Sequence, residues 1–306
     1  MLGPLLFLIY MNDVSGGTEQ VKVYLFADDI LIISLHKNYT NMMNNLQDSF
    51  DDIVMWCNEN EVAMNLNKTQ FICIQSAQRL RVNGEKIYKH SVNHINCNKE
   101  CTIINEVEDA KYLGLIIDNK WGHKNHILSI IKKLRRMMPN LYKLKNILDN
   151  TNKLKVYYSW IESILRYGIE VYGHAKHSHL LKLQKIQNKV IKILFKQNDM
   201  ESTKDIYIRT KLLNIKQLRE FCIIYNNYFN RDYKEINKDK ANLFRNTTYR
   251  YNVPKCNNDY GKRCRQYNIP MLFNKLPLAL TTLASYSGAK KELKKFLLQN
   301  VEPGLF

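Results

Sequence analysis

The hydrophobic pattern of this 306-residue chain changes its period near residue 120, and this change limits the folds that the chain can adopt. Before that point, short runs rich in Ile and Val alternate with turn residues, which is typical of strands. From about residue 123, apolar residues recur every three or four positions, which is typical of amphipathic helices. We therefore predict an α+β protein in which an antiparallel sheet with packed helices is followed by an all-helical region.

The first 120 residues contain the clearest hairpin. Residues 21–26 and 30–33 have strand character, and Ala27-Asp28-Asp29 between them predicts a tight turn with two adjacent carboxylates. Residues 41–57 place apolar side chains at helical spacing, which predicts a helix packed on the sheet. Further strands or hairpins are expected at residues 70–75, at 79–87 with a turn at Asn83-Gly84, and at 111–118.

The remainder of the chain is predicted to be helical with one long interruption. The expected helices cover residues 123–148, 152–172, 176–197, 204–230 and 288–299. An Asn-rich stretch at residues 232–265 separates the last two and is expected to form a loop or arm.

Charge divides along the same boundary. The formal net charge of +18 is the sum of −5 over residues 1–120 and +23 over residues 121–306. A field of this sign attracts polyanions, and a nucleic-acid backbone is the commonest large polyanion. Two alternatives remain: the lysines only solubilise the helices, or they contact a membrane surface, which is the weaker alternative.

The apolar run at residues 2–11 is too short to span a bilayer and lacks the basic start of a signal peptide. We expect instead that the chain begins inside a core element, as a truncated protein would. The seven cysteines are scattered without a secretory framework, which favours reduced thiols in an intracellular compartment. We expect no membrane partner.

Two adjacent aspartates in a turn can reflect ordinary turn chemistry. Here the apolar strands on both sides would fix Asp28 and Asp29 at a sheet edge, where two like charges are costly unless a cation neutralises them. Carboxylates hold the divalent ions of nucleotidyl transfer. The hairpin therefore predicts a site for Mg²⁺ or Mn²⁺.

Several segments together resemble the reverse transcriptases of non-LTR retrotransposons of the Jockey type. The run Leu2-Gly3-Pro4-Leu5-Leu6-Phe7-Leu8-Ile9-Tyr10-Met11-Asn12-Asp13 resembles the tail of motif B, and Phe26-Ala27-Asp28-Asp29 the catalytic motif C. Trp56-Cys57-Asn58 with Asn65-Leu66-Asn67-Lys68-Thr69 is similar to motif D, and Tyr112-Leu113-Gly114 to the primer-grip hairpin. Residues 164–173, 183–191 and 273–277 resemble the downstream helical segments of that family.

This resemblance implies a partial polymerase palm at residues 1–120, a helical thumb or connection at 121–230 and a basic C-terminal region at 231–306. Asp28 would be a catalytic metal ligand and Asp29 its less critical neighbour. Lys68 would lie near the triphosphate, and Leu113 and Gly114 would seat the primer end. The implied partners are an RNA template, a DNA primer and deoxynucleoside triphosphates.

The family's motif A, fingers and Pro-Gln-Gly-Ser start of motif B are not in this sequence. We therefore expect an RNA-directed DNA polymerase fragment that is inactive alone, because positioning and electrostatic stabilisation are the main sources of such catalysis. The alternative is a non-catalytic remnant that binds nucleic acid through its basic helical region.

Two other groups of residues are candidate binding sites. His90, His94, Cys97 and Cys101 have zinc-ligand types, but they fall in a polar stretch for which a solvated loop is the favoured interpretation. A dense basic face is expected on the first helix after the sheet, where it would follow template and primer phosphates. Its residues are Lys132, Lys133, Arg135, Arg136, Lys143 and Lys145.

Overall fold

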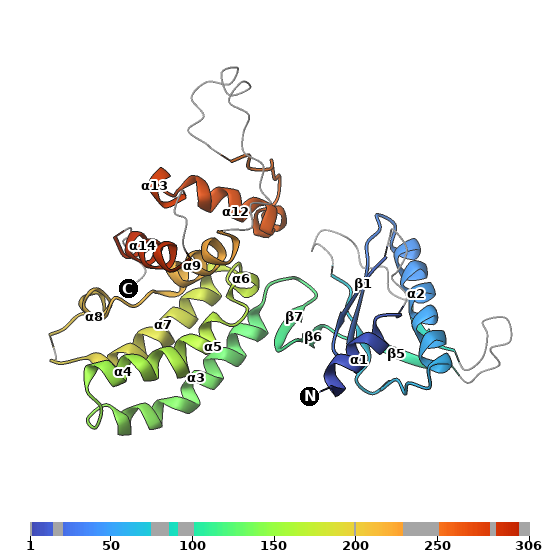
Figure 1. Cartoon of the computed structure of the whole chain (residues 1–306), viewed down its shortest axis with the longest axis horizontal. Coiled ribbons are helices and arrows are strands. Elements are labelled where there is room, and N and C mark those ends of the chain that lie inside the picture. The colour runs from blue at the N-terminus through green and yellow to red at the C-terminus, as the bar shows by residue number, and fades with distance from the viewer. Residues whose placement is uncertain are drawn as a thin grey trace, which may run out of the picture. The chain divides into compact units, whose positions relative to one another are not determined.

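The computed structural model describes residues 2–14, 21–74, 86–90, 101–198, 200–228, 251–281 and 286–299. The chain divides into two compact units, Met1–Trp121 and Gly122–Phe306 (Figure 1). The first combines small sheets with helices, and the second is mainly helical. The α+β class with a helical second part is thereby confirmed.

The predicted hairpin is present. Strands β1 (Val21–Phe26) and β2 (Asp29–Ser34) pair antiparallel, with Phe26 opposite Asp29 and a two-residue turn between them. Side chains alternate between the two faces of a strand, so Val23, Ile30 and Ile32 share one face, which packs on a hydrophobic core. Asp29 therefore starts the second strand and points to the opposite face.

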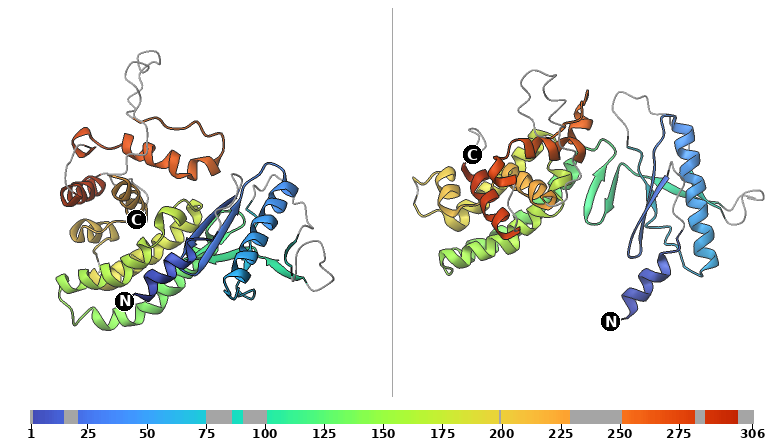
Figure 2. Two further views of the ribbon diagram at one scale, coloured as in Figure 1. Left: turned by 45° about the vertical axis from the view of Figure 1, so that its right-hand side comes forward. Right: turned by 45° about the horizontal axis from the view of Figure 1, so that its top comes forward.

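Helix α2 (Tyr39–Glu59) covers the inner face of this hairpin, as Figure 2 shows. The Asn38 side chain caps it by accepting the Thr40 N–H at 2.8 Å. The helix buries apolar residues against two small cores, one with β2 and one with Ile87 and Ile104 of the neighbouring strands. This confirms the helix predicted over residues 41–57.

Three short strands form a second sheet in the order β3-β5-β4. Strand β3 (Gln70–Phe71) runs parallel to β5 (Thr102–Glu106), and β4 (Ile87–Lys89) runs antiparallel to it. The strand predicted over 70–75 is therefore too long, because only two residues pair. Of the hairpin predicted at 79–87, residues 79–85 lie outside the described residues.

The hairpin expected at residues 111–118 is confirmed as β6 (Asp109–Tyr112) and β7 (Leu115–Asp118), which pair antiparallel. Its turn has positive φ angles at both central residues, 44° at Leu113 and 79° at Gly114. This is the pattern of the two-residue turns that match the twist of the flanking strands.

Helix α1 (Gly3–Met11) is apolar on every side, yet its side chains are exposed from Leu2 to Tyr10. Only Met11 enters the core, and the Tyr10 hydroxyl donates to the Asn60 carbonyl beside α2. The prediction of a core element is therefore wrong for this segment, because no described element covers it. No helix of the described ranges is long and apolar enough to cross a bilayer.

The helices predicted at 123–148 and 176–197 are present as α3 (Lys124–Leu144) and α7 (His177–Phe195), and they pack along each other (Figure 1). Their facing stripes include Leu134, Leu141, Leu183 and Val190, all fully buried. These side chains belong to one large continuous core.

Two of the predicted helices are broken. Residues 152–172 form α4 (Asn150–Val156), a π-helical turn η2 (Tyr157–Glu162), α5 (Ser163–Arg166) and α6 (Ile169–Tyr172), with Gly168 at φ 66° as the break. Residues 204–230 form α8 (Thr203–Thr210) and α9 (Ile215–Asn227). Lys211 at φ 54° ends α8, and a capping box at Asn214 begins α9.

The C-terminal helices are α11 (Asp259–Arg263), α12 (Arg265–Asn274), α13 (Leu278–Thr281) and α14 (Tyr286–Gln299). The basic helix predicted at 288–299 is confirmed, and Gln217 of α9 ties it down by donating to the Leu297 carbonyl at 2.7 Å. The prediction of a loop at 232–265 is wrong over α11, whose first turn is capped by the Asn258 side chain, which accepts the Gly261 N–H. Residues 232–250 of that stretch lie outside the described residues.

A buried polar network fixes α7 within the core. Gln184 donates to Gln187 Oε1 at 2.9 Å and to the Tyr207 hydroxyl at 2.9 Å. Gln187 in turn donates to the Tyr157 hydroxyl at 2.9 Å and the Leu213 carbonyl at 2.8 Å. Buried polar groups bonded in this way specify one packing arrangement among the helices.

Two histidines of this unit are held neutral. Burial, followed by the charges of His123 and Lys133, lowers the pKa of His126 to about 4. Burial also lowers the pKa of His174 to about 4, with Arg219 as the next cause. Because both pKa values lie below the ordinary 6.5, the unfolded chain binds more protons than the folded chain between pH 4 and 6.5.

Acidification should therefore destabilise the helical unit. Between pH 7 and pH 5 the free energy of unfolding should fall by about 2 kcal/mol through His126, and by less through the half-buried His174. Urea unfolding at both pH values measures the fall. His126→Gln should reduce the pH dependence, and an unchanged dependence in this variant would contradict the assignment.

Candidate active site

The carboxylate pair lies at the tip of the β1–β2 hairpin. Ala27 and Asp28 form the turn, and Ala27 has a positive φ of 53°. A residue with a side chain is strained in this left-handed region, where glycine is the ordinary residue of two-residue hairpin turns. Such strain is often found at functional sites.

Asp28 and Asp29 are both exposed, and neither carboxylate has a hydrogen bond or ion pair among the described residues. Two adjacent carboxylates repel one another, and no cationic side chain of the described residues pairs with them. The hairpin therefore presents oxygen donors that remain available for a ligand.

The neighbours of Asp29 follow from the strand register. Phe26 is its cross-strand partner, and Tyr24 pairs with Leu31 on the same face, away from the hairpin's buried face. Tyr24 and Phe26 are 49% and 61% exposed. The acidic turn is thus continuous with an open aromatic surface.

Tyr112, the last residue of β6, is electrostatically coupled to this turn. Burial raises the pKa of its hydroxyl, and the Asp29 carboxylate raises it further. Tyr112, which directly precedes the Leu113-Gly114 turn, thus lies within the electrostatic reach of Asp29. The sequence prediction placed Tyr112 in the Tyr112-Leu113-Gly114 motif but assigned a role only to Leu113 and Gly114.

Lys68 is exposed in the turn that follows α2. Its backbone N–H donates to the Asn65 carbonyl at 3.1 Å, and the Thr69 hydroxyl donates to the same carbonyl at 2.9 Å. Asn65 thus fixes the backbone at Lys68 but leaves its ammonium group in solvent. The structure gives Lys68 no hydrogen bond or ion pair with Asp28 or Asp29.

The donor set at the hairpin fits a hard divalent cation. Mg²⁺ is usually held by one or two carboxylates, while water and substrate phosphates supply its other ligands. Asp28 and Asp29 supply two carboxylates with unused oxygens. The described residues contain no group of three His, Cys, Asp or Glu side chains that could hold a metal. The two carboxylates therefore suit a metal ion that takes its remaining ligands from water and substrate.

The zinc candidate is not supported at its two described residues. His90 Nδ1 lies 3.2 Å from Cys101 Sγ, but Cys101 is disulfide-bonded and offers no free thiolate. The expectation of reduced cysteines is therefore wrong at this position. Zinc binds cysteine as the thiolate. His94 and Cys97 lie outside the described residues.

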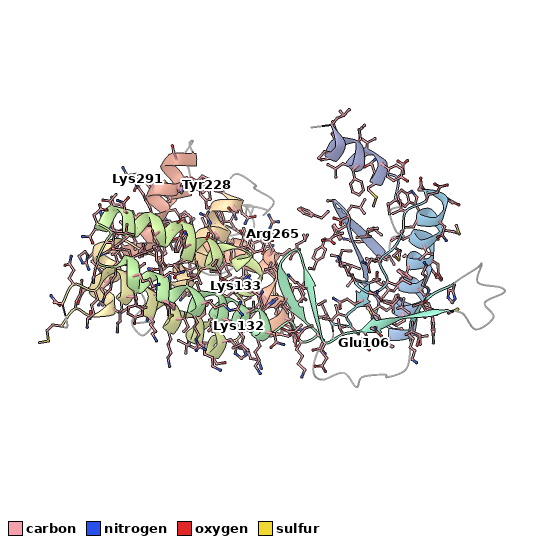
Figure 3. The ribbon with its side chains drawn as sticks, turned by 90° about the horizontal axis from the view of Figure 1, so that it is seen from below. Glu106, Lys132, Lys133, Tyr228, Arg265 and Lys291 are labelled. Atoms are coloured by element: carbon pink, nitrogen blue, oxygen red, sulfur yellow. The ribbon has the colours of Figure 1, made fainter. Side chains whose placement is uncertain are left out.

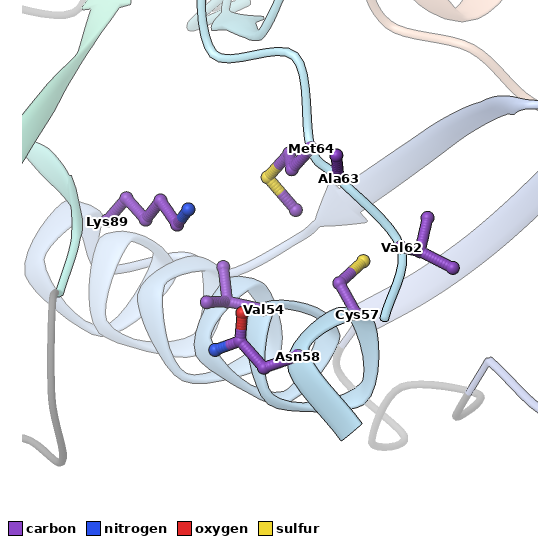
Figure 4. A pocket seen from close by; sticks show the side chains of 7 residues that line it. All are labelled: Val54, Cys57, Asn58, Val62, Ala63, Met64 and Lys89. Atoms are coloured by element: carbon purple, nitrogen blue, oxygen red, sulfur yellow. The ribbon is translucent and has the colours of Figure 1, made fainter. Parts of the chain in front are cut away.

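A cavity of about 170 Å³ lies beside α2 and contains none of the predicted site residues (Figure 4). Burial raises the pKa of the Cys57 thiol at its wall, and Lys89 opposes part of that rise. Its other lining residues are Val54, Asn58, Val62, Ala63 and Met64. The cavity is therefore not part of the acidic site.

The basic face predicted on α3 is present (Figure 3 labels Lys132 and Lys133). Lys132, Lys133, Arg135, Arg136 and Lys143 are exposed, opposite the buried stripe of the helix. Lys145 differs from them, because it is half-buried at the C-cap and its Nζ lies 5.8 Å from the Tyr142 ring centroid.

Comparison with protein families identifies the first unit. A family model described as reverse transcriptase (RNA-dependent DNA polymerase) matches residues 1–117. Residues 1–117 belong to the reverse transcriptase family. The matched range includes the acidic turn and the β6–β7 hairpin.

The chain is also similar to proteins of mobile elements. The RNA-directed DNA polymerase from mobile element jockey of Drosophila funebris is 26% identical over 240 residues, which are 74% of this chain and 24% of the relative. The probable RNA-directed DNA polymerase from transposon X-element of Drosophila melanogaster is 25% identical over 203 residues, which are 63% of this chain and 21% of the relative.

These matches confirm the relation to non-LTR retrotransposon reverse transcriptases. The chain spans between a fifth and a quarter of the length of these curated relatives. No solved structure matches it.

Strain at the turn of the reverse transcriptase segment can be tested with Ala27→Gly. Glycine removes the left-handed penalty, so the hairpin should become about 1 kcal/mol more stable and its amides should exchange about fivefold more slowly. Hydrogen exchange of the β1 and β2 backbone measures this directly. Ala63→Gly, at a position without positive φ, is the matched control and should have no stabilising effect. Faster β1–β2 exchange in Ala27→Gly would contradict the strain.

Proposed function

We propose that the chain is part of the RNA-directed DNA polymerase of a non-LTR retrotransposon. In this proposal residues 1–120 form part of the palm, 121–230 the thumb or connection, and 231–306 a basic C-terminal region. The family match over residues 1–117, with the exposed carboxylate pair inside it, carries the proposal.

Asp28 and Asp29 would hold Mg²⁺ or Mn²⁺ at the hairpin tip. When bound, the metal would neutralise phosphate charge and activate the primer hydroxyl, as divalent ions do in nucleotidyl transfer. The contribution of the chain is positional, because the strand pairing of Phe26 with Asp29 fixes where the carboxylates stand. Asp28 is assigned the larger role.

The other predicted site residues take supporting roles in this proposal. Leu113 and Gly114, in the turn after Tyr112, would seat the primer end close to the acidic turn, which the Asp29–Tyr112 coupling supports. The solvent-exposed Lys68 would contact the triphosphate of an incoming deoxynucleotide. The substrates would be an RNA template, a DNA primer and deoxynucleoside triphosphates.

We further propose that these 306 residues alone have negligible polymerase activity. Two carboxylates on an exposed turn bind a divalent ion weakly, because most of its ligands must then come from water and substrate. The chain also spans only 21–24% of the two relatives' lengths. Catalysis of this kind depends on positioning and electrostatics together.

The second candidate is a non-catalytic nucleic-acid-binding protein. The composition of α3 favours it, because the helix carries several exposed cations and no Asp or Glu. In this case the chain would bind phosphates through Lys132, Lys133, Arg135, Arg136 and Lys143 without using the acidic turn.

Metal binding tests the role of the carboxylate pair without requiring activity. Mn²⁺ binding to the full chain, measured by electron paramagnetic resonance, should weaken roughly tenfold in Asp28→Asn and less in Asp29→Asn, because each removes one ligand charge. Asp52→Asn removes an equally exposed carboxylate from α2 and is the control, which should bind as the parent does. Equal Mn²⁺ affinity in Asp28→Asn and the parent would favour the non-catalytic candidate.

A further inference from the structure

Helix α7 carries a row of cations that the acidic site does not use. Lys182, Lys185, Lys189 and Lys192 are all exposed. At about 100° per residue these four positions fall within an arc of about 80°, and they extend about 15 Å along the axis. We name this set the lysine stripe.

The stripe lies opposite the helix's buried face. Leu183, Gln187, Val190 and Leu194 are fully or almost fully buried in the core of the helical unit. The polar network at Gln184 and Gln187 fixes the rotation of α7 about its own axis. The lysines therefore form a solvent-facing row whose backbone positions are fixed.

A solvated helix face ordinarily mixes charges of both signs, because Glu–Lys pairs three or four residues apart stabilise a helix. Helix α7 has no Asp or Glu, whereas α2, α9 and α14 each contain at least one. None of the four lysines forms an ion pair within the part of the chain that the structure describes.

The like-charged neighbours at positions i and i+3 or i+4 therefore repel one another, which destabilises α7. A bound polyanion would remove this repulsion. The regular spacing suits a phosphodiester backbone, because lysines about 5 Å apart along the axis can each approach a phosphate.

We propose that the lysine stripe is a second nucleic-acid contact surface, distinct from the basic face of α3. Each row faces away from the buried stripe of its own helix, and the two helices pack side by side. The stripe binds phosphates without reading bases, so binding is sequence-independent and sensitive to salt. The inference rests on the proposed function only in taking nucleic acid as the polyanion.

The test compares two triple variants of the full chain with equal loss of charge. The stripe variant is Lys185→Gln, Lys189→Gln and Lys192→Gln. The control variant is Lys155→Gln, Lys204→Gln and Lys275→Gln, three exposed positions on other elements. Gln has a helix propensity close to that of Lys, and unchanged circular dichroism and urea midpoints verify folding.

Fluorescence anisotropy with a labelled single-stranded RNA, and with an RNA–DNA duplex, measures affinity across a salt series. The stripe variant should lower the slope of log affinity against log salt by about 2 and weaken binding roughly a hundredfold at about 0.1 M salt. In the control variant, the salt slope and the affinity should both change much less. A larger effect on one of the two probes identifies which nucleic acid the stripe contacts.

Equal losses of nucleic-acid affinity in the stripe and control variants would overturn the proposal, because net charge alone would then explain the binding. Loss of binding to phosphatidylserine vesicles without loss of RNA or duplex binding would overturn it in favour of a membrane surface. The comparison is repeated in the Asp28→Asn background, where the stripe effect should persist. This repeat separates an error in the proposed metal site at Asp28 from an error in the proposed nucleic-acid contact of the lysine stripe.

Discussion

The packing of α2 against one face of the β1–β2 hairpin is the contact on which the acidic site depends. Val23, Ile30 and Ile32 bury that face, and strand alternation then directs Asp29 to the opposite, open face. Apolar burial contributes about 25 cal/mol per Å², so this packing can hold two adjacent like charges in an exposed turn. The strand pairing thus fixes the backbone at Asp29, while both carboxylates stay exposed.

In the helical unit, the residues that stabilise the fold lie in the core, and the cations lie on the outer faces of the helices. Its core includes a polar network around Gln184 and Gln187, which fixes the register of α7 against the neighbouring helices. The outer faces of α3 and α7 carry cations without a single acidic residue. The same rotation of each helix that buries its apolar stripe therefore directs its cations outward, so that core packing determines where a phosphate backbone would lie.

Periodicity was sufficient to predict the β1–β2 hairpin, α2, α3, α7 and the helical character of the second unit. It did not predict the breaks at Gly168 and Lys211, because positive-φ residues can interrupt a helix whose apolar pattern continues across them. The exposure of α1 was also missed, since an apolar run carries no information about whether another element covers it. Asp28 and Asp29 could be found from their flanking strands, whereas the electrostatic interaction between Asp29 and Tyr112 could not, because it depends on how the two hairpins are placed in space.

The central claim is that this chain carries an acidic turn and a nucleic-acid-binding surface of a reverse transcriptase without forming a complete active site. RNA-templated primer extension with Mg²⁺ or Mn²⁺, comparing the chain with its Asp28→Asn variant, tests it most directly. The account predicts no incorporation by either protein while both retain the RNA. Nucleotide incorporation by the chain that Asp28→Asn abolishes would contradict it, since the active site would then be complete.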